Sequence, residues 1–250
     1  DVIVPVYDGL EETKRCIDSV LKNRNATPFN LLVIDDCSPN PGIRSYLQAL
    51  SEKGVIELLV NDKNIGFVRT ANRGMSLHPD RDVLLLNSDT EVANDWLDRI
   101  VKHAESDGRI ATITPFSNNA ELCSFPRYCQ PNALFLGKSV AEIDAVFASL
   151  PASQIAIRTG VGFCMFIRRD ALIDIGMFDE LTFGMGYGEE NDFCMRASAV
   201  GWRNVACSNV FVFHEGGVSF STEKAALLAT TLMAIEKAEA EEVTVGGIGE

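Results

Sequence analysis

The stretch Leu84-Leu85-Leu86-Asn87-Ser88-Asp89-Thr90-Glu91 changes abruptly from aliphatic to polar residues. Its apolar beginning is typical of a strand that is buried on both faces of a sheet. Polar side chains that directly follow such a strand lie at the carboxyl edge of an open α/β sheet, where ligands bind. Two interpretations are open at this point: a capped turn, or a site where Asp89 faces a metal ion and a phosphorylated ligand.

Strands and amphipathic helices alternate through the first 115 residues or so. We expect strands over residues 2–7, 31–34, 55–60, 83–86 and 110–114, with a helix after each of the first four. The second helix shows the i, i+3, i+4, i+7 spacing of one buried face in Ile43, Tyr46, Leu47 and Leu50. Asn94 or Asp95 can cap the helix that follows the fourth strand. This alternation predicts right-handed βαβ units and a mostly parallel sheet.

The pattern changes after residue 115. Residues 115–135 contain three prolines among Asn and Ser residues and are expected to form a long excursion, a kind of segment that is usually functional or mobile. Further elements are expected as follows: helices near 139–150, from 168 and from 189, a glycine-rich turn at 184–188, strands at 161–167 and 210–213, a helix at 222–242 and a tail at 243–250. We see no repeat or linker, so residues 1–242 are expected to form a single domain.

The charge balance restricts the partners of the chain. Its net charge of -13 argues against a general nucleic-acid binder and against an anionic membrane surface as a partner. A small anionic ligand is compatible with this charge if a cation lies between the ligand and the carboxylates.

Cysteine usage and hydropathy indicate the compartment. None of the seven cysteines forms a C-x-x-C pair, which argues against a zinc site or a disulfide framework and favours a reducing, cytoplasmic location. No apolar run approaches the ~20 residues that span a bilayer, and we see no signal peptide. Because the chain opens at Asp1 directly on a strand, we expect an excised domain whose flanking regions can place it at the inner face of a membrane.

Four polar clusters follow strands or glycine turns: Asp35-Asp36, Asn87 to Glu91, Glu189 to Asp192, and His214. Each also has a purely structural interpretation, as an Asx turn, a helix N-terminus that favours acidic residues, or a packed histidine. Adjacent carboxylates after a buried strand are costly unless something binds them. A partly desolvated carboxylate after Gly184-x-Gly186-x-Gly188 could also serve as a general base.

The clusters share their order with a known family. The motifs are Val2-Ile3-Val4-Pro5-Val6-Tyr7, Ile34-Asp35-Asp36-Cys37-Ser38, Asn64-x-Gly66-Phe67 with Asn72-x-Gly74, Leu86-Asn87-Ser88-Asp89, Gly176-x-Phe178-Asp179-Glu180, and Gly188-Glu189-Glu190-Asn191-Asp192 with Arg196. Over about residues 1–220 the chain resembles family 2 glycosyltransferases, in the branch related to rhamnosyl- and galactofuranosyl-transferases.

The resemblance implies an α/β fold of the GT-A type, with a Rossmann-like sheet and a mixed C-terminal portion. It also implies an inverting transfer of a sugar from a UDP- or dTDP-linked donor to a glycan acceptor, in polysaccharide biosynthesis. Residues 1–115 would form the nucleotide-binding half and residues 116–221 the acceptor and catalytic half. The nucleotide would be held by Pro5, Val6, Tyr7, Asp35, Asp36, Gly66, Asn72 and Ser88.

The resemblance also implies the catalytic groups. Asp89 and His214 would bind Mn²⁺ or Mg²⁺, Glu190 would be the catalytic base, and Gly162, Glu189 and Asp192 would lie on the acceptor side. A divalent cation neutralises the charge of a leaving diphosphate, and an imidazole ligand favours Mn²⁺. Inversion needs one base and no covalent nucleophile.

The chain departs from the family pattern at two positions. Asn87 stands where the family has its first Asp, and Glu190 stands where it has an Asp. The alternative function is therefore a catalytically inactive module of the same fold that binds a sugar nucleotide or glycan. A nucleotidyltransferase would need a basic, glycine-rich loop after the first strand, where this chain has Asp8-Gly9-Leu10-Glu11-Glu12. A Rossmann dehydrogenase would need G-x-G-x-x-G there, which is absent.

Overall fold

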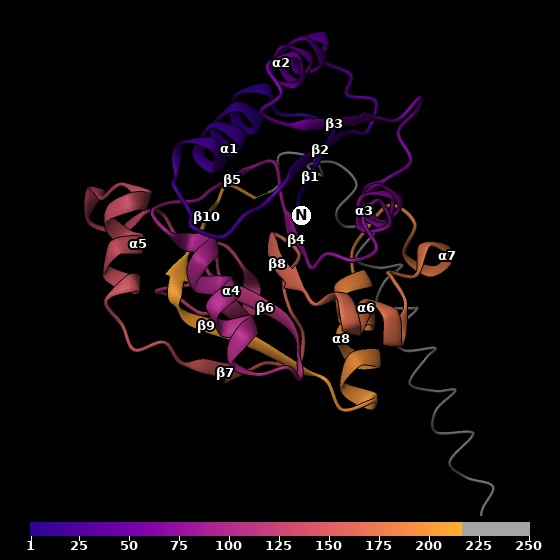
Figure 1. Ribbon diagram of the computed structural model, residues 1–250. Coiled ribbons are helices and arrows are strands. Elements are labelled where there is room, and N and C mark those ends of the chain that lie inside the picture. Colours follow the sequence, from indigo (N-terminus) through magenta and orange to yellow (C-terminus); the bar gives the residue numbers. More distant parts are fainter. Residues whose placement is uncertain (217–250) are drawn as a thin grey trace, which may run out of the picture.

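The computed structural model describes residues 1–216, which form a large sheet covered by helices on both faces and a second sheet of two short strands (Figure 1). The large sheet contains β1 (Val2–Val6), β2 (Leu31–Asp35), β3 (Glu57–Val60), β4 (Val83–Leu86), β6 (Ile110–Phe116), β7 (Gln154–Ala156), β8 (Cys164–Ile167) and β9 (Arg203–Phe211). The small sheet pairs β5 (Thr90–Glu91) with β10 (Phe213–His214). The expected helix at 222–242 and the tail at 243–250 lie outside the described residues.

The helices are α1 (Leu10–Lys22), α2 (Pro41–Glu52), α3 (Phe67–Met75), α4 (Trp96–Ser106), α5 (Val140–Ala148), α6 (Arg169–Ile175), α7 (Glu180–Phe183) and α8 (Glu189–Ala199), with short 3-10 turns η1 (Glu121–Cys123) and η2 (Phe135–Gly137). Through α4 the helices follow the strands in the expected alternation, whereas α6, α7 and α8 follow one another directly. Among residues 1–216, no helix is long and apolar enough to cross a membrane.

The strand order of the large sheet is β3-β2-β1-β4-β8-β6-β9-β7. Strands β3, β2, β1 and β4 are parallel, and β6 is parallel to β9. Strand β8 runs antiparallel between β4 and β6, and β7 is an antiparallel edge strand. These pairings confirm the predicted α/β class, with a parallel first half and a mixed C-terminal portion.

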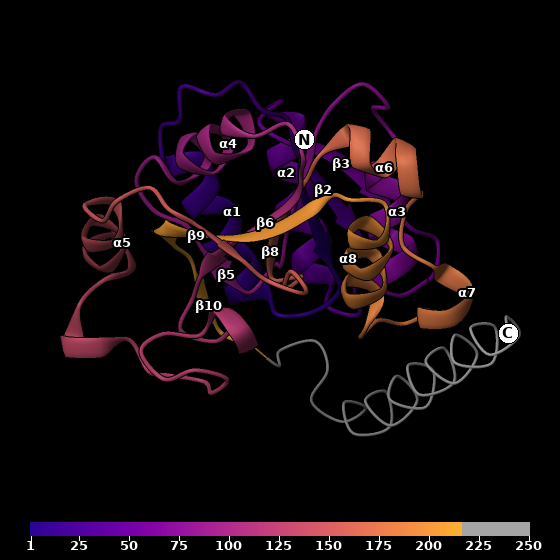
Figure 2. The ribbon, with the colours of Figure 1, turned by 90° about the horizontal axis from the view of Figure 1, so that it is seen from below.

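The two faces of the sheet carry separate cores, because successive residues of a strand point to opposite sides. In β1, Val4 packs in a core with Ile17 of α1 and Trp96 of α4. Its neighbour Ile3 packs in the other core with Met75 of α3 and Phe193 of α8. Figures 1 and 2 show α1 and α4 on one side of the sheet and α3, α6 and α8 on the other.

The strand expected at 210–213 is wrong in its bounds, because β9 begins at Arg203 and ends at Phe211. Buried asparagines interrupt its apolar pattern, and the protein satisfies them. Asn204 Oδ1 accepts from Thr112 Oγ1 at 2.9 Å, and its Nδ2 donates to the Cys194 carbonyl at 3.0 Å. Asn209 Oδ1 lies 2.8 Å from His103 Nε2. Strand β9 can therefore be mostly buried without being apolar.

The expected cap of α4 is correct in position but not in its side-chain hydrogen bond. Asp95 occupies the N-cap position, but its side chain makes no capping hydrogen bond and instead accepts from Arg99 Nε at 2.9 Å. Asn94 donates to the Asp144 carboxylate at 2.8 Å. The first turn is instead capped from the loop after α1, because Asn25 Oδ1 accepts from the N–H groups of Leu97 and Asp98 at 3.1 and 3.4 Å.

The excursion predicted after residue 115 is confirmed from residue 117 onward. Between β6 and η2 it contains only the short turn η1. Asn132 holds its ends together by donating from Nδ2 to the carbonyls of Asn118, Arg127 and Gln130, at distances of 2.8–3.1 Å. Because Asn118 lies directly after β6, this asparagine closes the excursion into a compact loop.

Candidate active site

The carboxyl ends of β1, β2 and β4 meet at one edge of the sheet, because the three strands are parallel neighbours. The backbone N–H of Asp36 donates to the Val6 carbonyl at 2.8 Å, which joins the ends of β1 and β2. Asn87 follows β4 at the same edge, and its N–H donates to the Phe163 carbonyl at 2.8 Å. The polar clusters after β2 and β4 therefore lie at the ligand-binding edge of an α/β sheet.

A tight turn places Asp89 after β4. Thr90 closes the turn by donating from its N–H and its hydroxyl to the Asn87 carbonyl, at 3.3 and 2.7 Å. Ser88 and Asp89 are both buried. The turn leads directly into β5, so the position of the Asp89 carboxylate depends on how β5 is held.

Helix α1 provides that support through polar residues on one face. Cys16 Sγ lies 3.4 Å from the Asn87 carbonyl, and Ser19 Oγ accepts from the Val92 N–H at 3.1 Å. Asn23 Nδ2 donates to the Val92 carbonyl at 3.0 Å. Cys16, Ser19 and Asn23 follow an i, i+3, i+7 spacing, so one stripe of the helix tracks the segment that carries Asp89. The sequence analysis missed this role, although the polar stripe was visible.

His214 lies beside Asp89 because β10 pairs antiparallel with β5, with His214 opposite Thr90. Its Nε2 is 3.4 Å from Asp89 Oδ1. The Gly216 N–H donates to Asp89 Oδ2, and the Glu215 N–H donates to the Asp89 carbonyl, both at 3.0 Å. The structure thus brings together the two residues that were predicted as metal ligands.

The excursion fixes the imidazole of His214. Its Nδ1 lies 2.6 Å from the Asn119 carbonyl oxygen, which can only accept, so Nδ1 carries a hydrogen. The Asn118 carboxamide pairs with the N–H and the carbonyl of His214, both at 2.9 Å. Phe163 stacks on the ring at a centroid distance of 5.2 Å. Asn118 and Asn119 were not predicted, because no local pattern links them to a distant histidine.

The facing atoms of Asp89 and His214 suit a cation. When Nδ1 of a neutral imidazole carries the hydrogen, Nε2 offers a lone pair toward the Asp89 carboxylate. His214 Nε2 and Asp89 Oδ1, two acceptors 3.4 Å apart, are stable in this arrangement only with a proton or a metal ion between them. A backbone carbonyl that orients the other ring nitrogen is the usual partner of a metal-binding histidine.

The charge of Asp89 also fits this role. Burial raises the pKa of its carboxyl, but the hydrogen bond and charge of a protonated His214, together with the Gly216 N–H, outweigh burial and lower the pKa from its ordinary value; that proton on Nε2 occupies the place that a cation would take. Asp89 is therefore ionised near neutral pH. Among residues 1–216, no cluster of three or more His, Cys, Asp or Glu side chains is suited to a metal ion. Within residues 1–216, Asp89 and His214 are thus a facing pair, and an ion held by such a pair would take its other oxygens from water or a ligand.

The two acidic residues after β2 are engaged by the protein. Asp35 is fully buried, and its carboxylate accepts from the Ser38 N–H at 2.7 Å and from the Arg44 guanidinium. Asp36 Oδ1 accepts from Asn61 Nδ2 at 2.7 Å, and its Oδ2 accepts from the Gly66 N–H at 3.0 Å. Asp36 therefore shapes the loop before α3 and keeps little acceptor capacity for a ligand.

The other predicted nucleotide-binding residues divide into two groups. Pro5 and Val6 are paired with β2 as the last residues of β1, and the half-buried Tyr7 follows them at the edge of the sheet. Asn72 instead lies within α3 and is buried against the segment before α7. Its Nδ2 donates to the Phe178 carbonyl at 2.9 Å, and its Oδ1 accepts from the Phe178 N–H at 3.2 Å. Asn72 thus positions this segment, with its amide groups occupied by protein.

The glycine turn before α8 packs against the same loop. A Cβ atom on Gly66 would lie 2.9 Å from Met185 Sδ and 3.0 Å from the Gly184 carbonyl, so only glycine fits at this contact. Gly186, Tyr187 and Gly188 follow with φ angles of 132°, 71° and 98°. A left-handed Tyr is uncommon, and it lets the chain turn sharply into α8.

Glu189 and Glu190 begin α8 as predicted. The Oε2 atoms of both are buried, and neither has a hydrogen-bond partner among the described residues. Burial and the charge of Glu190 raise the pKa of Glu189 well above 4.5. Burial also raises the pKa of Glu190, with partial compensation from the backbone of Gly162. A Cβ atom on Gly162 would lie 3.6 Å from Glu190 Oε1, so this glycine leaves space beside the carboxylate.

Asp192 lies one turn further along α8. Its carboxylate accepts from Arg196 Nε at 2.8 Å and is therefore neutralised within the helix. Glu190 is thus the acidic residue of α8 that combines a raised pKa with intermediate exposure of the residue as a whole, although its Oε2 atom is buried.

The family model of Glycosyl transferase family 2 matches residues 1–176, which is more than half of the chain. The chain belongs to glycosyl transferase family 2. This family 2 chain is 23% identical over 180 residues to Glycosyltransferase AglE of Haloferax volcanii, and the match covers 71% of the chain and 55% of the relative. The chain thus spans about half the length of this curated relative.

Solved structures with the same fold include two glycosyltransferases crystallised with ligands. GalNAc-T7 with UDP, GalNAc and Mn²⁺ has a TM-score of 0.65 and 16% identity, covering 85% of this chain and 43% of that one. The mannosyltransferase PcManGT from Pyrobaculum calidifontis with GDP-Man and Mn²⁺ has a TM-score of 0.64 and 16% identity, covering 94% and 63%. These likenesses show that the family 2 chain has a GT-A fold.

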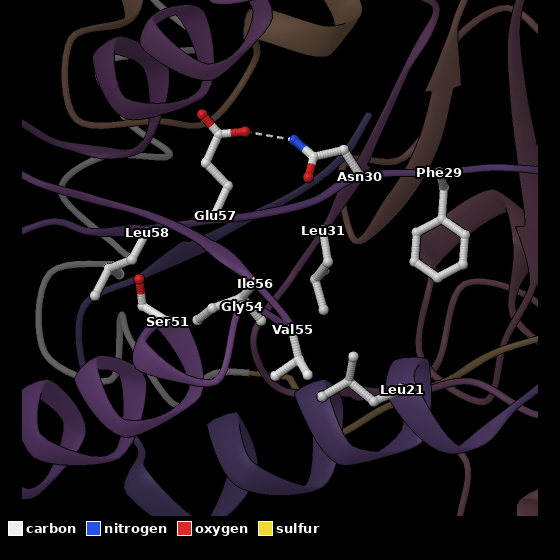
Figure 3. Close-up of a pocket in the computed structure, with 10 residues that line it drawn as sticks. All are labelled: Leu21, Phe29, Asn30, Leu31, Ser51, Gly54, Val55, Ile56, Glu57 and Leu58. Atoms are coloured by element: carbon white, nitrogen blue, oxygen red, sulfur yellow. Dashed lines mark hydrogen bonds between the residues drawn. The ribbon is translucent and has the colours of Figure 1, made fainter.

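A hollow of about 630 Å³ opens at the opposite edge of the sheet in this family 2 chain (Figure 3). Leu31 and Glu57, the first residues of β2 and β3, line it, and Glu57 accepts a hydrogen bond from Asn30 Nδ2 at 2.6 Å. Its lining includes no predicted site residue. The predicted site residues Asp89 and His214 lie at the carboxyl edge instead.

Proposed function

We propose that this chain transfers a sugar from a nucleoside-diphosphate sugar to a hydroxyl group of a glycan or other acceptor, with inversion and with the help of a divalent cation. The observation that carries the proposal is the pairing of Asp89 and His214 at 3.4 Å, at the carboxyl edge of a GT-A sheet. An ionised carboxylate and an oriented imidazole would together provide the protein ligands of the cation.

The cation would neutralise the negative charge that develops on the leaving diphosphate, acting as a Lewis acid. Asp89 and His214 would hold it, and the diphosphate would supply further oxygens. Both Mn²⁺ and Mg²⁺ accept oxygen ligands, and the imidazole favours Mn²⁺. In support, the GalNAc-T7 and PcManGT structures both contain Mn²⁺.

Glu190 would act as the base. As the acceptor oxygen bonds to the anomeric carbon, the Glu190 carboxylate takes the hydroxyl proton. The bond from that carbon to the diphosphate oxygen breaks, and its electron pair leaves with the diphosphate. Because burial raises the pKa of Glu190, its ionised form is a stronger base than an ordinary glutamate. One displacement without a covalent intermediate inverts the anomeric centre.

The donor would lie along the carboxyl edge of the sheet. Val6, Tyr7, Ser88 and the loop held by Asp36 would form the nucleotide side, and the donor would be UDP- or dTDP-linked. The similar solved structures contain UDP and GDP-Man. They support a nucleoside-diphosphate sugar as the donor but do not identify its nucleobase.

The acceptor would approach from the side of α8. Gly162 leaves space beside Glu190, and Glu189 and Asp192 flank it on the helix. A rhamnosyl- or galactofuranosyl-transferase-like role in polysaccharide biosynthesis, at the cytoplasmic side of a membrane, is part of this proposal. We also propose that the chain forms a single domain, in which residues 1–115 are the nucleotide-binding half and residues 116–221 are the acceptor half.

The test uses the purified chain with a panel of UDP-, dTDP- and GDP-linked sugars and Mn²⁺. Calorimetry measures binding, and a product assay with hydroxyl acceptors measures transfer. Wild type is expected to bind and turn over one donor. Asp89→Ala should lose the Mn²⁺-dependent part of donor binding, whereas Glu190→Gln should retain binding and lose turnover.

Two results would contradict the proposal in different ways. Full activity of both variants would remove Asp89 and Glu190 from the mechanism. Donor binding by wild type without turnover of any acceptor would instead support a non-catalytic module that binds sugar nucleotides. The stereochemistry of a new product, read from its anomeric coupling, tests inversion separately.

A further inference from the structure

Arg15 of α1 contacts both strands of the small sheet. Its Nη2 donates to Glu215 Oε2 at 2.8 Å, directly after β10. Its Nε lies 4.0 Å from Glu91 Oε2 on β5, within ion-pair distance but too far for a hydrogen bond. Its guanidinium carbon lies 5.4 Å from the centre of the Phe213 ring on β10, at cation–π distance. One side chain thus joins two segments that are far apart in the sequence.

These contacts surround the candidate cation ligands. Glu91 follows Asp89 by two residues, and Phe213 and Glu215 flank His214. The ladder between the strands contains only the pairs Phe213–Glu91 and His214–Thr90. A two-stranded ribbon of this length is marginal by itself. The separation of Asp89 and His214 therefore depends on contacts from outside the ribbon.

We propose that Arg15 is a positioning residue for the cation site: it holds β5 and β10 together and so sets the separation of Asp89 and His214. The inference rests on the proposed function, because it assumes that these two side chains bind a divalent cation. Arg15 supplies no ligand atom in this arrangement. It acts through Glu91, Phe213 and Glu215.

The exposure of Arg15 makes the inference testable. About a third of its side chain is exposed, at 35%, and Glu215 is 45% exposed. Neither belongs to the hydrophobic core, so their removal is not expected to unfold the protein. The adjacent Lys14 is a matched control. It carries the same charge and lies on the same helix, and its Nζ pairs with Glu11 Oε1 at 2.8 Å.

The sign of the effect separates positioning from simple electrostatics. A positive charge near a cation site repels the ion. If Arg15 acted only through its charge, its removal would therefore tighten Mn²⁺ binding. Removal of a positioning residue would weaken it. If Arg15 contacted only the diphosphate of a donor, binding of Mn²⁺ alone would not change.

The experiment titrates the purified chain with Mn²⁺ alone and follows the free ion by electron paramagnetic resonance. Arg15→Gln is expected to weaken Mn²⁺ binding about tenfold, the scale seen for outer-shell partners of metal ligands. Lys14→Gln should bind Mn²⁺ like wild type. Thermal unfolding of each variant checks that the fold is retained. Unchanged or tighter binding in Arg15→Gln overturns the inference.

Glu215→Gln provides a second approach from the other side of the ion pair. If Arg15 and Glu215 act as a unit, the fold-loss of Mn²⁺ affinity in the double variant should be much smaller than the product of the fold-losses in the two single variants. Fully additive effects would contradict a shared positioning role.

Asp89→Ala separates this inference from the proposed function. If wild type binds Mn²⁺, Asp89→Ala does not, and Arg15→Gln binds like wild type, only the role of Arg15 fails. If wild type shows no Mn²⁺ binding, or Asp89→Ala leaves it unchanged, the cation site and the role of Arg15 fail together.

Discussion

The imidazole Nδ1 of His214 and the backbone carbonyl of Asn119 are joined by a hydrogen bond of 2.6 Å. This contact connects the excursion after β6 to the last described strand. It fixes which nitrogen of His214 carries the hydrogen and which one faces Asp89. The excursion therefore helps to build the proposed cation site as well as bordering it.

His214→Gln is expected to raise the Mn²⁺ concentration for half-maximal transfer about tenfold or more, because the ligand nitrogen is lost. The measurement is the initial rate against Mn²⁺ concentration at saturating donor. His78→Gln, which changes a half-buried histidine that pairs with Asp1, is the matched control. The same Mn²⁺ dependence in His214→Gln and wild type would exclude His214 as a ligand.

The acid limb of the pH–rate profile should report Glu190. Transfer needs its ionised form, and burial raises its pKa above 4.5. The rate is therefore expected to fall, as the pH is lowered, at a higher pH than an ordinary glutamate would produce. The profile of kcat at saturating donor and Mn²⁺ measures this. A rate that stays constant down to pH 4.5 would argue against Glu190 as the base.

Glu189→Gln should stabilise the protein at neutral pH. Because the pKa of Glu189 is raised in the folded state, the folded state holds its proton more tightly than the unfolded state. The stability that this proton contributes is present at low pH and is lost as the pH rises toward the folded-state pKa. Glutamine mimics the neutral acid, so the Tm of the variant should exceed that of wild type at pH 7–8.

Each kcal/mol gained in this way should raise the Tm by about 2–4 °C for a chain of this size. Near pH 4.5 the two proteins should have similar Tm values. A variant that is less stable than wild type at pH 7–8 would show that Glu189 is ionised and stabilised in the fold.

Gly162→Ala should lower turnover while the fold is retained. A Cβ atom at this position would lie 3.6 Å from Glu190 Oε1, which is ordinary contact but fills the space beside the base. We expect a rise in the KM for the acceptor, a fall in kcat, and little change in Tm. Gly108→Ala is the control, because a Cβ atom there meets nothing within 4 Å. Unchanged acceptor kinetics in Gly162→Ala would place the acceptor elsewhere.

Asp144→Ala should be strongly destabilising. Asp144 is fully buried and accepts from Arg99 Nη2 at 2.5 Å, Asn94 Nδ2 at 2.8 Å and the Phe211 N–H at 3.0 Å. Its removal leaves the buried Arg99 with only the exposed Asp95 carboxylate and leaves the Phe211 N–H without its acceptor, and the loss of a buried partner of this kind costs up to about 3–5 kcal/mol. Denaturant unfolding measures the loss, with the exposed Asp62→Ala as control. A loss equal to that of the control would show that water replaces the carboxylate.

The sequence predicted most elements of the first half because their apolar residues repeat with clear helix or strand periods. The residues after β2 and β4 and at the start of α8 could also be identified, since turn residues separate them from buried segments. Strand β9 was misplaced because Asn204 and Asn209 are buried through hydrogen bonds that no local pattern reveals. The contacts of Asn119 and Arg15 join distant segments, so they required the fold itself.

Strand β9 lies inside the sheet, between β6 and β7, and it leads directly to His214. During synthesis, β1 to β4 can pair long before β9 leaves the ribosome, because their contacts are closer in sequence. The edge that carries Asp36 and Asp89 can then exist early, whereas His214, which pairs with Asp89, is added much later. Mn²⁺ affinity should therefore appear only when the chain is complete through His214, and it would serve as a late marker of folding.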